Sequence, residues 1–414
     1  MREIGRPPPE PCRGWYVSSH TVPLKALGAA EALAGPKEQS VGGDCLSEPA
    51  CRACGSHAGD LVLDLGNQPA ADWLPPRGDL GPDPVYPLQM WLCASCGLAQ
   101  LVAGPSTTEE PQGIEPAAVI AQAREAVRRV SAAGLLPHGG RVAEYRSPHD
   151  GSWMDLLVPY GLSPACEGAP AEVVLDCFGL MHVADQAAAV AERAARVAPG
   201  GVLLVQYHSL EAIVSHGQWN LLRHGHYAYH STTSLTKILA ARGFCSLTGW
   251  RFDLFGGTVL LTAARVADGG RPGPRVELLL RQDERTGVRD ATVLRGLQRQ
   301  AEDHAARLHE WLVAEQTAGR AVVGYGAASR AVPLLVFAGA DRTLLQAVAD
   351  ASVAKQGRRM PGTDIPIIAP SQIADHEPLS VLVLVPDLLS EVRASLPGIE
   401  ASGARWVDVA VLGP

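Results

Sequence analysis

The stretch AEVVLDCFGLMHVADQAAAVAERAARVAPGGVLLVQY, residues 171–207, decides the fold class. It starts with a short apolar run, continues with an alanine-rich segment of helical pattern, and ends with a second apolar run. Short buried strands that alternate with helices are typical of an α/β sheet. RVAEY at 141–145 and GTVLLTAA at 257–264 extend the same alternation on both sides. We therefore predict an α/β fold, with a Rossmann-like sheet in the middle of the chain.

The rest of the 414 residues divides around this sheet into segments of different character. Residues 1–45 are rich in proline and glycine and predict a flexible extension. Residues 46–104 carry four cysteines and form a small domain, and residues 116–266 hold the central sheet. Residues 275–318 are a long amphipathic stretch that predicts a helical linker. Residues 319–414 repeat the strand, glycine turn and helix pattern, and predict a second Rossmann-like domain.

Composition limits the class of protein and its partners. The net charge is −8, whereas a nucleic-acid-binding protein usually has a basic domain. The apolar runs are too short to span a membrane, and the first residues lack the apolar core of a signal peptide. We expect a cytoplasmic protein whose partner is a small-molecule substrate, with no nucleic acid and no membrane.

Four of the nine cysteines form two pairs with metal-ligand spacing. Cys51 and Cys54 make one CxxC pair, and Cys93 and Cys96 make the second after 38 intervening residues. Two such pairs supply four thiolates to one tetrahedral ion, which suits zinc, and a closed shell indicates a structural site. The alternatives are buried free thiols or a redox pair.

The stretch RHGHYAYHS, residues 223–231, concentrates histidine and tyrosine. A histidine near neutral pKa is a suitable general base. The other interpretations are hydrogen-bonded residues at a helix end, or a catalytic zinc held by His224, His226 and His230. No acidic or cysteine partner is spaced to help such a zinc site.

Several motifs together resemble one family. They include CRACG at 51–55, WNLLRHGHYAYHSTTSLTKILAARGF at 219–244 and KQGRRMPGTDIPI at 355–367. They are similar to the NDP-deoxysugar C-methyltransferases, and the resemblance covers most of residues 51–414. It implies a zinc-binding domain, a methyltransferase domain that binds S-adenosylmethionine (SAM), and a carboxy-terminal Rossmann-like domain. It also implies methylation of a carbon beside a ketone on a nucleotide-linked 4-keto sugar.

The resemblance assigns roles to individual residues of the site. His226 matches the family's base, and His224 and His182 match two further histidines near the site. Tyr227 and Tyr229 are candidates to donate hydrogen bonds to an oxyanion. Arg223 replaces a family tyrosine, and its permanent charge is suited to an anion or an enolate. Gly225 replaces a family glutamate.

The expected SAM site departs from the family more strongly. Glu144, Asp150 and Gly151 retain its first loop, but Arg146 stands where the family has glycine. The interval of about 30 residues before the next strand has room for one strand–helix–strand unit, where a full SAM fold needs two more strands. The family's aromatic segment after the zinc domain is missing, and Gln206 replaces a family glutamate. These losses predict weak or absent SAM binding.

The carboxy-terminal domain carries the weaker nucleotide-site signals. VVGYGAASR at 322–330 is a lone G-x-G-x-x-S turn, and Asp350 lies where a ribose-binding acid would be expected. We do not predict bound NAD. Lys355 and Arg358, with the adjacent Arg359, predict either a contact to a substrate diphosphate or a solvated loop.

Three functional hypotheses follow. The first is a SAM-dependent C-methyltransferase of secondary metabolism with His226 as base. The second keeps the base but lacks the donor, and catalyses isomerisation, elimination or cyclisation. The third is a non-catalytic homologue that supports a partner enzyme.

Overall fold

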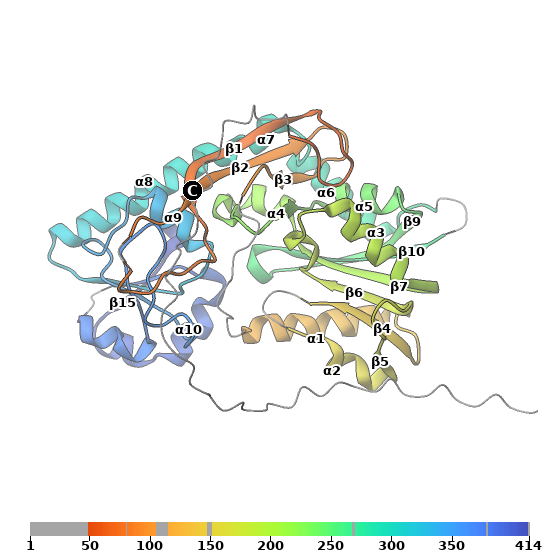
Figure 1. The fold of residues 1–414 in the computed structure, drawn as a ribbon. Coiled ribbons are helices and arrows are strands. Elements are labelled where there is room, and N and C mark those ends of the chain that lie inside the picture. Colours follow the sequence, from red (N-terminus) through yellow and green to blue (C-terminus); the bar gives the residue numbers. More distant parts are fainter. Residues whose placement is uncertain are drawn as a thin grey trace, which may run out of the picture. The chain divides into compact units, whose positions relative to one another are not determined.

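The computed structural model describes residues 49–79, 81–104, 115–146, 151–266, 270–377 and 380–412. The predicted extension at 1–45 lies outside these residues. Between Pro49 and Pro414 the described chain forms three β-sheets with helices packed around them (Figure 1).

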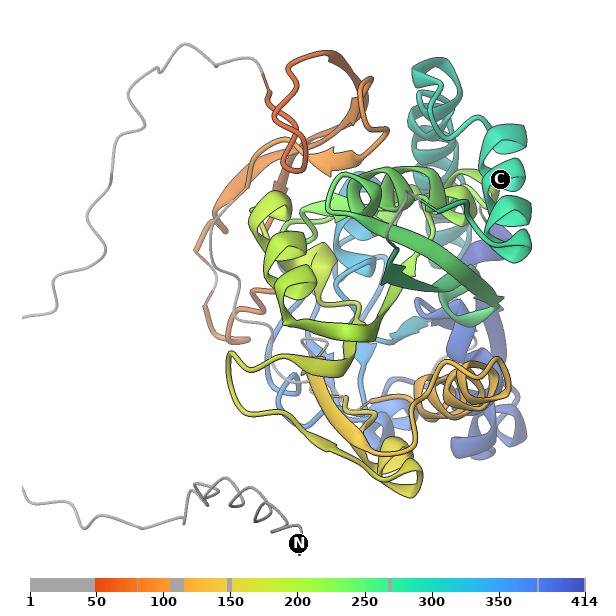
Figure 2. The same cartoon turned by 90° about the vertical axis from the view of Figure 1, so that its right-hand side faces the viewer.

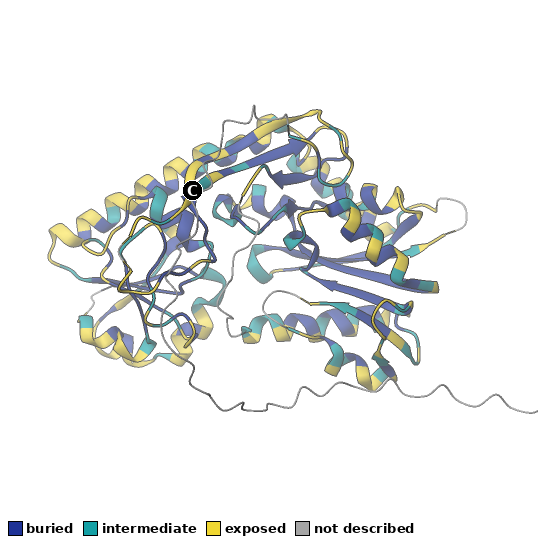
Figure 3. Cartoon of the chain, viewed as in Figure 1, coloured by how far each residue is buried: buried dark blue, intermediate teal, exposed yellow. Residues whose placement is uncertain are grey.

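The central sheet has six strands in the order β5-β4-β6-β7-β10-β9. Strands β4 to β7 are parallel, and β10 runs antiparallel to both of its neighbours. Almost every residue of β6 is buried, which explains its continuous apolar run, since a parallel sheet is covered on both faces (Figure 3). The strands are β4 (Gly140–Tyr145), β5 (Leu162–Pro164), β6 (Ala171–Cys177), β7 (Val197–His208), β9 (Phe244–Phe252) and β10 (Thr258–Arg265).

Helices cover both faces of this sheet (Figures 1 and 2). On one face lie α1 (Ala117–Ala132) and the short α2 (Met154–Leu157), which share an apolar core with β4, β6 and β9. The other face packs against α3, α5 and α6. Asp185 caps α3 by accepting from the Ala188 N–H, and Ser231 begins α5 with a reciprocal capping box. These helices are α3 (Gln186–Arg196), α5 (Thr232–Ala240) and α6 (Pro274–Thr286).

The cysteine-containing segment forms an antiparallel sheet with strand order β1-β2-β3-β8. Its own strands are β1 (Gly59–Pro69), β2 (Val85–Cys93) and β3 (Ala99–Leu101). The fourth, β8 (Ala228–Tyr229), comes from the histidine-rich stretch far along the chain, and pairs with β3. The cysteine-containing segment therefore holds the candidate catalytic stretch directly.

The carboxy-terminal sheet is parallel, in the order β13-β12-β11-β14-β15. Residues 275–318, predicted as one helical stretch, are divided among α6, α7 (Ala291–Leu294) and α8 (Gly296–Thr317), because Gly287 ends α6 with a φ of 75°. Helices α8 and α9 share one core with β1 and β2. The remaining elements are α4 (Leu210–Ser215), α9 (Ala331–Phe337), α10 (Leu389–Ser395), α11 (Gly398–Ala401), β11 (Val322–Tyr325), β12 (Val348–Ala349), β13 (Ile367–Ile368), β14 (Ser380–Val383) and β15 (Arg405–Asp408).

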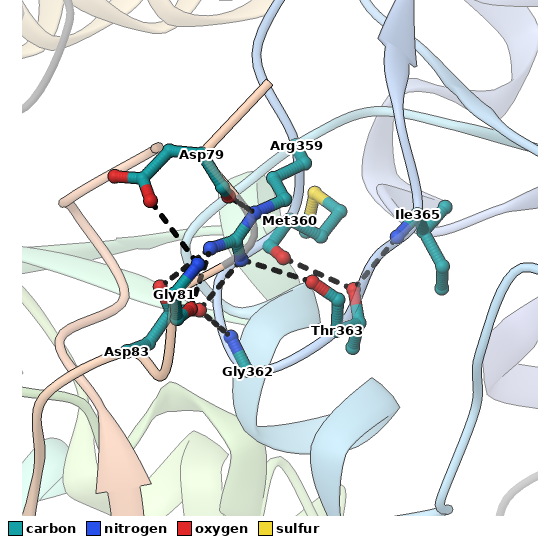
Figure 4. A network of polar contacts seen from close by, with 8 residues as sticks. All are labelled: Asp79, Gly81, Asp83, Arg359, Met360, Gly362, Thr363 and Ile365. Carbon is teal, nitrogen blue, oxygen red and sulfur yellow. Dashed lines mark hydrogen bonds and ion pairs between the residues drawn. The ribbon is translucent and has the colours of Figure 1, made fainter. Parts of the chain in front are cut away.

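A buried arginine joins the cysteine-containing segment to the carboxy-terminal domain (Figure 4). The Arg359 guanidinium makes a two-pronged ion pair with Asp83, at 2.7 and 2.8 Å, and donates to the Asp79 carbonyl at 2.7 Å. The Gly362 N–H donates to the same Asp83 carboxylate. The two side chains are only 4% and 5% exposed, so each charge depends on the other for compensation.

Replacing Arg359 with methionine should destabilise the protein by about 3–5 kcal/mol, because Asp83 would keep a buried charge without its cation. Thermal and urea unfolding measure this loss. Arg295→Gln is the matched control, since Arg295 pairs with Asp60 at an exposed position and its loss should cost about 0–1 kcal/mol. Equal losses in both variants would contradict the buried pair's importance.

His230 gives the fold a predictable response to acid. It is 1% exposed, and burial lowers its pKa to about 4. The Gln186 amide nitrogen donates to the Leu180 and Val183 carbonyls, so its oxygen faces His230 and requires a proton on Nε2. In the unfolded chain His230 takes up a proton near pH 6.5, whereas in the folded chain it does so only near pH 4. The folded state therefore keeps its full stability above pH 6.5 and loses stability as the pH falls below that value.

As the pH falls from 6.5 towards 4, His230 should remove about 3 kcal/mol of stability. In His230→Gln, which keeps a side-chain donor for Gln186, that part of the decline should disappear. Urea unfolding at a series of pH values compares the two slopes. Parallel wild-type and variant curves would show that His230 does not contribute this response.

Candidate active site and metal centre

The four cysteines meet at one point of the described structure. Cys51 and Cys54 lie in the turn before β1, while Cys93 ends β2 and Cys96 lies in the following turn. All four sulfurs lie within 4.8 Å of one another, with Cys51–Cys96 at 3.5 Å and Cys54–Cys93 at 3.7 Å. Zinc–sulfur bonds of about 2.3 Å in a tetrahedron place the sulfurs about 3.8 Å apart. The donor set and its geometry therefore fit zinc with a closed shell.

The first cysteine knuckle also contacts the central domain. Arg52, between its two cysteines, donates to the Ala184 carbonyl at 3.2 Å and lies 5.0 Å from the centre of the Tyr227 ring. Its own carbonyl accepts from the Ala187 N–H at the start of α3. The metal centre thus fixes a segment that touches the histidine-rich stretch.

Arg223 lies at the centre of the candidate active site. It is 5% exposed, and its Nε donates to His226 Nε2 at 3.0 Å. Its Nη1 forms an ion pair with Asp72, which follows β1, and its backbone N–H donates to the Tyr229 hydroxyl at 3.1 Å. Asp72 was not among the sequence candidates, although it lies in LDLGNQPAADWL, residues 63–74, a stretch that contributes to the resemblance.

Two predicted residues accompany His226. The His182 ring meets the His226 ring edge-on with centroids 4.6 Å apart, and the Tyr229 ring lies 6.2 Å away. The Tyr227 N–H donates to the Met181 carbonyl at 2.7 Å, which holds the His182 turn against this stretch. Burial raises the pKa of Tyr229, so its hydroxyl keeps its proton at neutral pH. The structure therefore brings His182, His226 and Tyr229 together.

His224 faces a different environment from His226. Gly225 between them has a φ of 85°, a conformation that suits glycine and turns the chain. His224 Nε2 contacts the Pro87 carbonyl at 3.2 Å, and its ring packs against Tyr86. Burial lowers the His224 pKa.

The three histidines of this stretch do not gather around one point. Among the described residues, the four cysteines are the one group whose potential ligand atoms lie close enough together to share a metal ion. The alternative of a histidine-held catalytic zinc therefore has no geometric support there.

The edge where the family's fold binds SAM is shortened. Among the described residues, β5 is the one strand outside β4, and it ends level with Val142, in the middle of β4. Arg196, just before β7, donates to the Cys166 and Ala169 carbonyls, which places this loop at the amino-terminal edge of the sheet. The exposed Glu167 lies in the same loop, so no acid from it reaches the carboxyl edge beside β4.

The described residues on either side of the segment 147–150 contact one another. The Glu144 carboxylate accepts from the Ser152 hydroxyl and the Trp153 N–H, both at 2.6 Å, and Arg146 lies 3.5 Å away. The space that a Cβ would take at Gly151 holds the Glu115 carboxylate. Asp150 lies outside the described residues. The described residues at this edge therefore form an incomplete cradle for SAM.

In the carboxy-terminal domain, the glycine turn at 324–329 is hydrogen-bonded to Asp350. The Asp350 carboxylate accepts from the Ala327 N–H at 2.8 Å, and the buried Lys355 amine donates to the Ala327 carbonyl at 3.0 Å. Arg358 donates to the Leu74 carbonyl at 2.7 Å. In this structure Lys355 and Arg358 make contacts within the chain that shape the fold, and the predicted diphosphate contact stays a prediction.

Comparison with known proteins gives three domain matches in the order that the fold shows. A zinc binding domain matches residues 51–107, a methyltransferase domain matches 116–247, and a C-methyltransferase C-terminal domain matches 253–410. In the described part of the chain, no helix is long and apolar enough to cross a membrane.

Among curated proteins, C-methyltransferase NovU of Streptomyces niveus is 24% identical over 402 residues, which cover 86% of this chain and 94% of NovU. Among solved structures, an O-methyltransferase family protein from Burkholderia thailandensis matches at 16% identity with a TM-score of 0.28, over 36% of this chain and 58% of its own. Magnesium protoporphyrin IX methyltransferase from Synechocystis, with bound SAH, matches at 15% identity with a TM-score of 0.27, over 35% of this chain and 83% of its own. The chain therefore matches, in order, a zinc binding domain, a methyltransferase domain and a C-methyltransferase C-terminal domain, and it is similar over most of its length to a C-methyltransferase.

Proposed function

We propose that the chain is an enzyme that moves a proton at a carbon next to a ketone, with His226 as the acid–base residue. The observation that carries the proposal is the cluster of buried His226, Tyr229 and Arg223 with the half-buried His182 beside them. The substrate class that best suits the family is a nucleotide-linked 4-keto-deoxysugar or a related ketone.

The chemistry needs a base and a stabilised oxyanion. The base takes the proton from carbon, and the electron pair of the broken C–H bond moves to the carbonyl oxygen, which gives an enolate. A buried guanidinium stabilises that negative charge strongly, because little water is present to screen it. Arg223 supplies the cation beside His226. The Tyr229 ring packs beside His226, while its hydroxyl accepts from the Arg223 backbone N–H and donates to the Leu221 carbonyl.

The fate of the enolate separates two candidate functions. In the family reaction SAM supplies a methyl group, which the enolate carbon receives. The second candidate is an isomerase, or an enzyme of elimination or cyclisation, in which that carbon takes no methyl group. The short β5 beside β4, and the Arg196 contact that holds the following loop near the start of β7, favour this second candidate.

Deuterium exchange tests the shared step. A nucleoside-diphosphate 4-keto-6-deoxyhexose incubated with the protein in D₂O should gain deuterium beside the ketone, as measured by mass spectrometry and NMR. His226→Gln should slow this exchange by about 10²–10⁴-fold, the usual contribution of a positioned base. His309→Gln, at an exposed histidine of α8, should exchange like the wild type. Exchange no faster than in buffer would refute the proposal.

Adding SAM to the same reaction separates the two candidates. A methylated product, together with calorimetric binding of SAM, would establish the family reaction. Continued exchange with no methylated product and no heat of SAM binding would establish the donor-free reaction.

Removing the metal should destabilise the zinc-binding domain, because the four thiolates would lose their common ion. We expect metal analysis to find about one zinc per chain, and chelation to lower the thermal midpoint and slow exchange at the active site. Cys96→Ser should lose the metal, whereas Cys245→Ser, at a buried cysteine of β9 outside the cluster, should keep it. Unchanged melting after verified zinc loss would contradict a structural role.

A further inference from the structure

We infer that Arg223, held by Asp72 of the zinc-binding domain, fixes His226 as the neutral tautomer with its proton on Nδ1. The inference rests on the proposed function for its catalytic meaning. It makes the zinc-binding domain a contributor to the acid–base site as well as a structural module.

The tautomer follows from the hydrogen bond between the two side chains. Every guanidinium nitrogen carries protons, so Arg223 Nε can only donate. Its partner at 3.0 Å is His226 Nε2, which must therefore present its lone pair. A neutral imidazole carries a single N–H, so the proton of His226 lies on Nδ1.

The charges favour the same state. An imidazolium has N–H groups on both nitrogens, so a protonated His226 would lose the bond from Arg223 and place two cations side by side. His226 is 7% exposed and Arg223 is 5% exposed, so water would screen this repulsion poorly. Arg223 thus keeps His226 neutral, and also occupies the lone pair that a base needs.

Asp72 explains how the cation is kept in place. Arg223 is always protonated, and its burial requires a compensating charge. Asp72 is 5% exposed and pairs with Arg223 through Nη1, which leaves Nε directed at His226. Two residues later, the Leu74 carbonyl accepts from Arg358 of the carboxy-terminal domain at 2.7 Å. The segment that carries Asp72 is therefore also fixed by a contact outside the candidate active site, with the carboxy-terminal domain.

This arrangement has a catalytic consequence. His226 Nε2 can accept a proton only after the bond from Arg223 opens. A developing enolate oxygen is a stronger acceptor for the guanidinium than a neutral imidazole is, because hydrogen bonds between charged groups are the stronger ones. We propose that the substrate's oxygen takes over the Arg223 N–H, which releases Nε2 as the base.

Nitrogen-15 NMR of the histidine side chains tests the tautomer without any substrate. The His226 signals, assigned by their loss in His226→Gln, should show a protonated Nδ1 and an unprotonated Nε2 at neutral pH. In the double variant Asp72→Asn/Arg223→Gln, which removes both charges together and so avoids a lone buried ion, this pattern should change to Nε2–H or to a mixture. Arg295→Gln, which removes an exposed arginine that also pairs with the zinc-binding domain, should leave it unchanged.

A protonated Nε2 in the wild type would overturn the inference. So would an Nδ1–H pattern that persists unchanged in the double variant. Because these measurements need no turnover, they decide the tautomer even if the wild type fails to exchange deuterium, a result that would refute the proposed function separately.

Chemical rescue tests the positioning role. Arg223→Ala should slow deuterium exchange by about 10²-fold, through loss of the base's alignment. Methylguanidinium should restore part of the rate by entering the space beside Asp72, and methylammonium, which lacks the planar fork, should restore less. Equal exchange in Arg223→Ala and wild type, or a loss that methylguanidinium does not reduce, would show that Arg223 does not position the base.

Discussion

The buried positive charge of Arg223 is the constraint on which the candidate site depends. A guanidinium does not lose its proton in a protein, so burial must be compensated by acceptors. Asp72 supplies the charge, and His226 accepts from Nε. This requirement sets the direction of the His226 ring and places the zinc-binding domain against the histidine-rich stretch. The pairing of β8 with β3 holds the same two segments together through the backbone.

A second buried arginine repeats the principle in the same connection between β1 and β2. Arg359 of the carboxy-terminal domain reaches Asp83, a few residues beyond the segment that carries Asp72. Apolar residues of β1 and β2 share a core with α8 and α9, so the domain is held by packing as well as by charge. The cysteine cluster fixes the opposite end of the same sheet, where β2 ends at Cys93. The zinc-binding domain thus connects the two Rossmann-like domains.

The sequence revealed the features whose cause is local. Apolar runs between helical patterns predicted the α/β sheets, and CxxC spacing predicted the cysteine cluster, because period and spacing directly reflect backbone geometry. The contacts that shape the active site are not local. Asp72 and Arg223 are 151 residues apart, and no pattern links them. The two residues of β8 are too few to show a strand period. Asp350 occupied the position of a ribose-binding acid, yet it binds the glycine turn itself.

The shortened edge of the central sheet has a geometric cause that bears on the methyl donor. Strand β5 has three residues, and six residues then return the chain to the start of β6. Such a short path cannot extend to the carboxyl edge, so it cannot carry a ribose-binding acid there. Among the described residues, two charged groups near that edge are paired with each other. The fully buried Asp176 bonds Arg193 at 2.5 Å, and Arg193 lies over the Tyr145 ring at 4.0 Å. A ligand that approached Asp176 would have to break this ion pair, whereas one that approached His226 would exchange a single hydrogen bond. The described contacts thus favour the proposed acid–base role of His226 over the proposed SAM cradle.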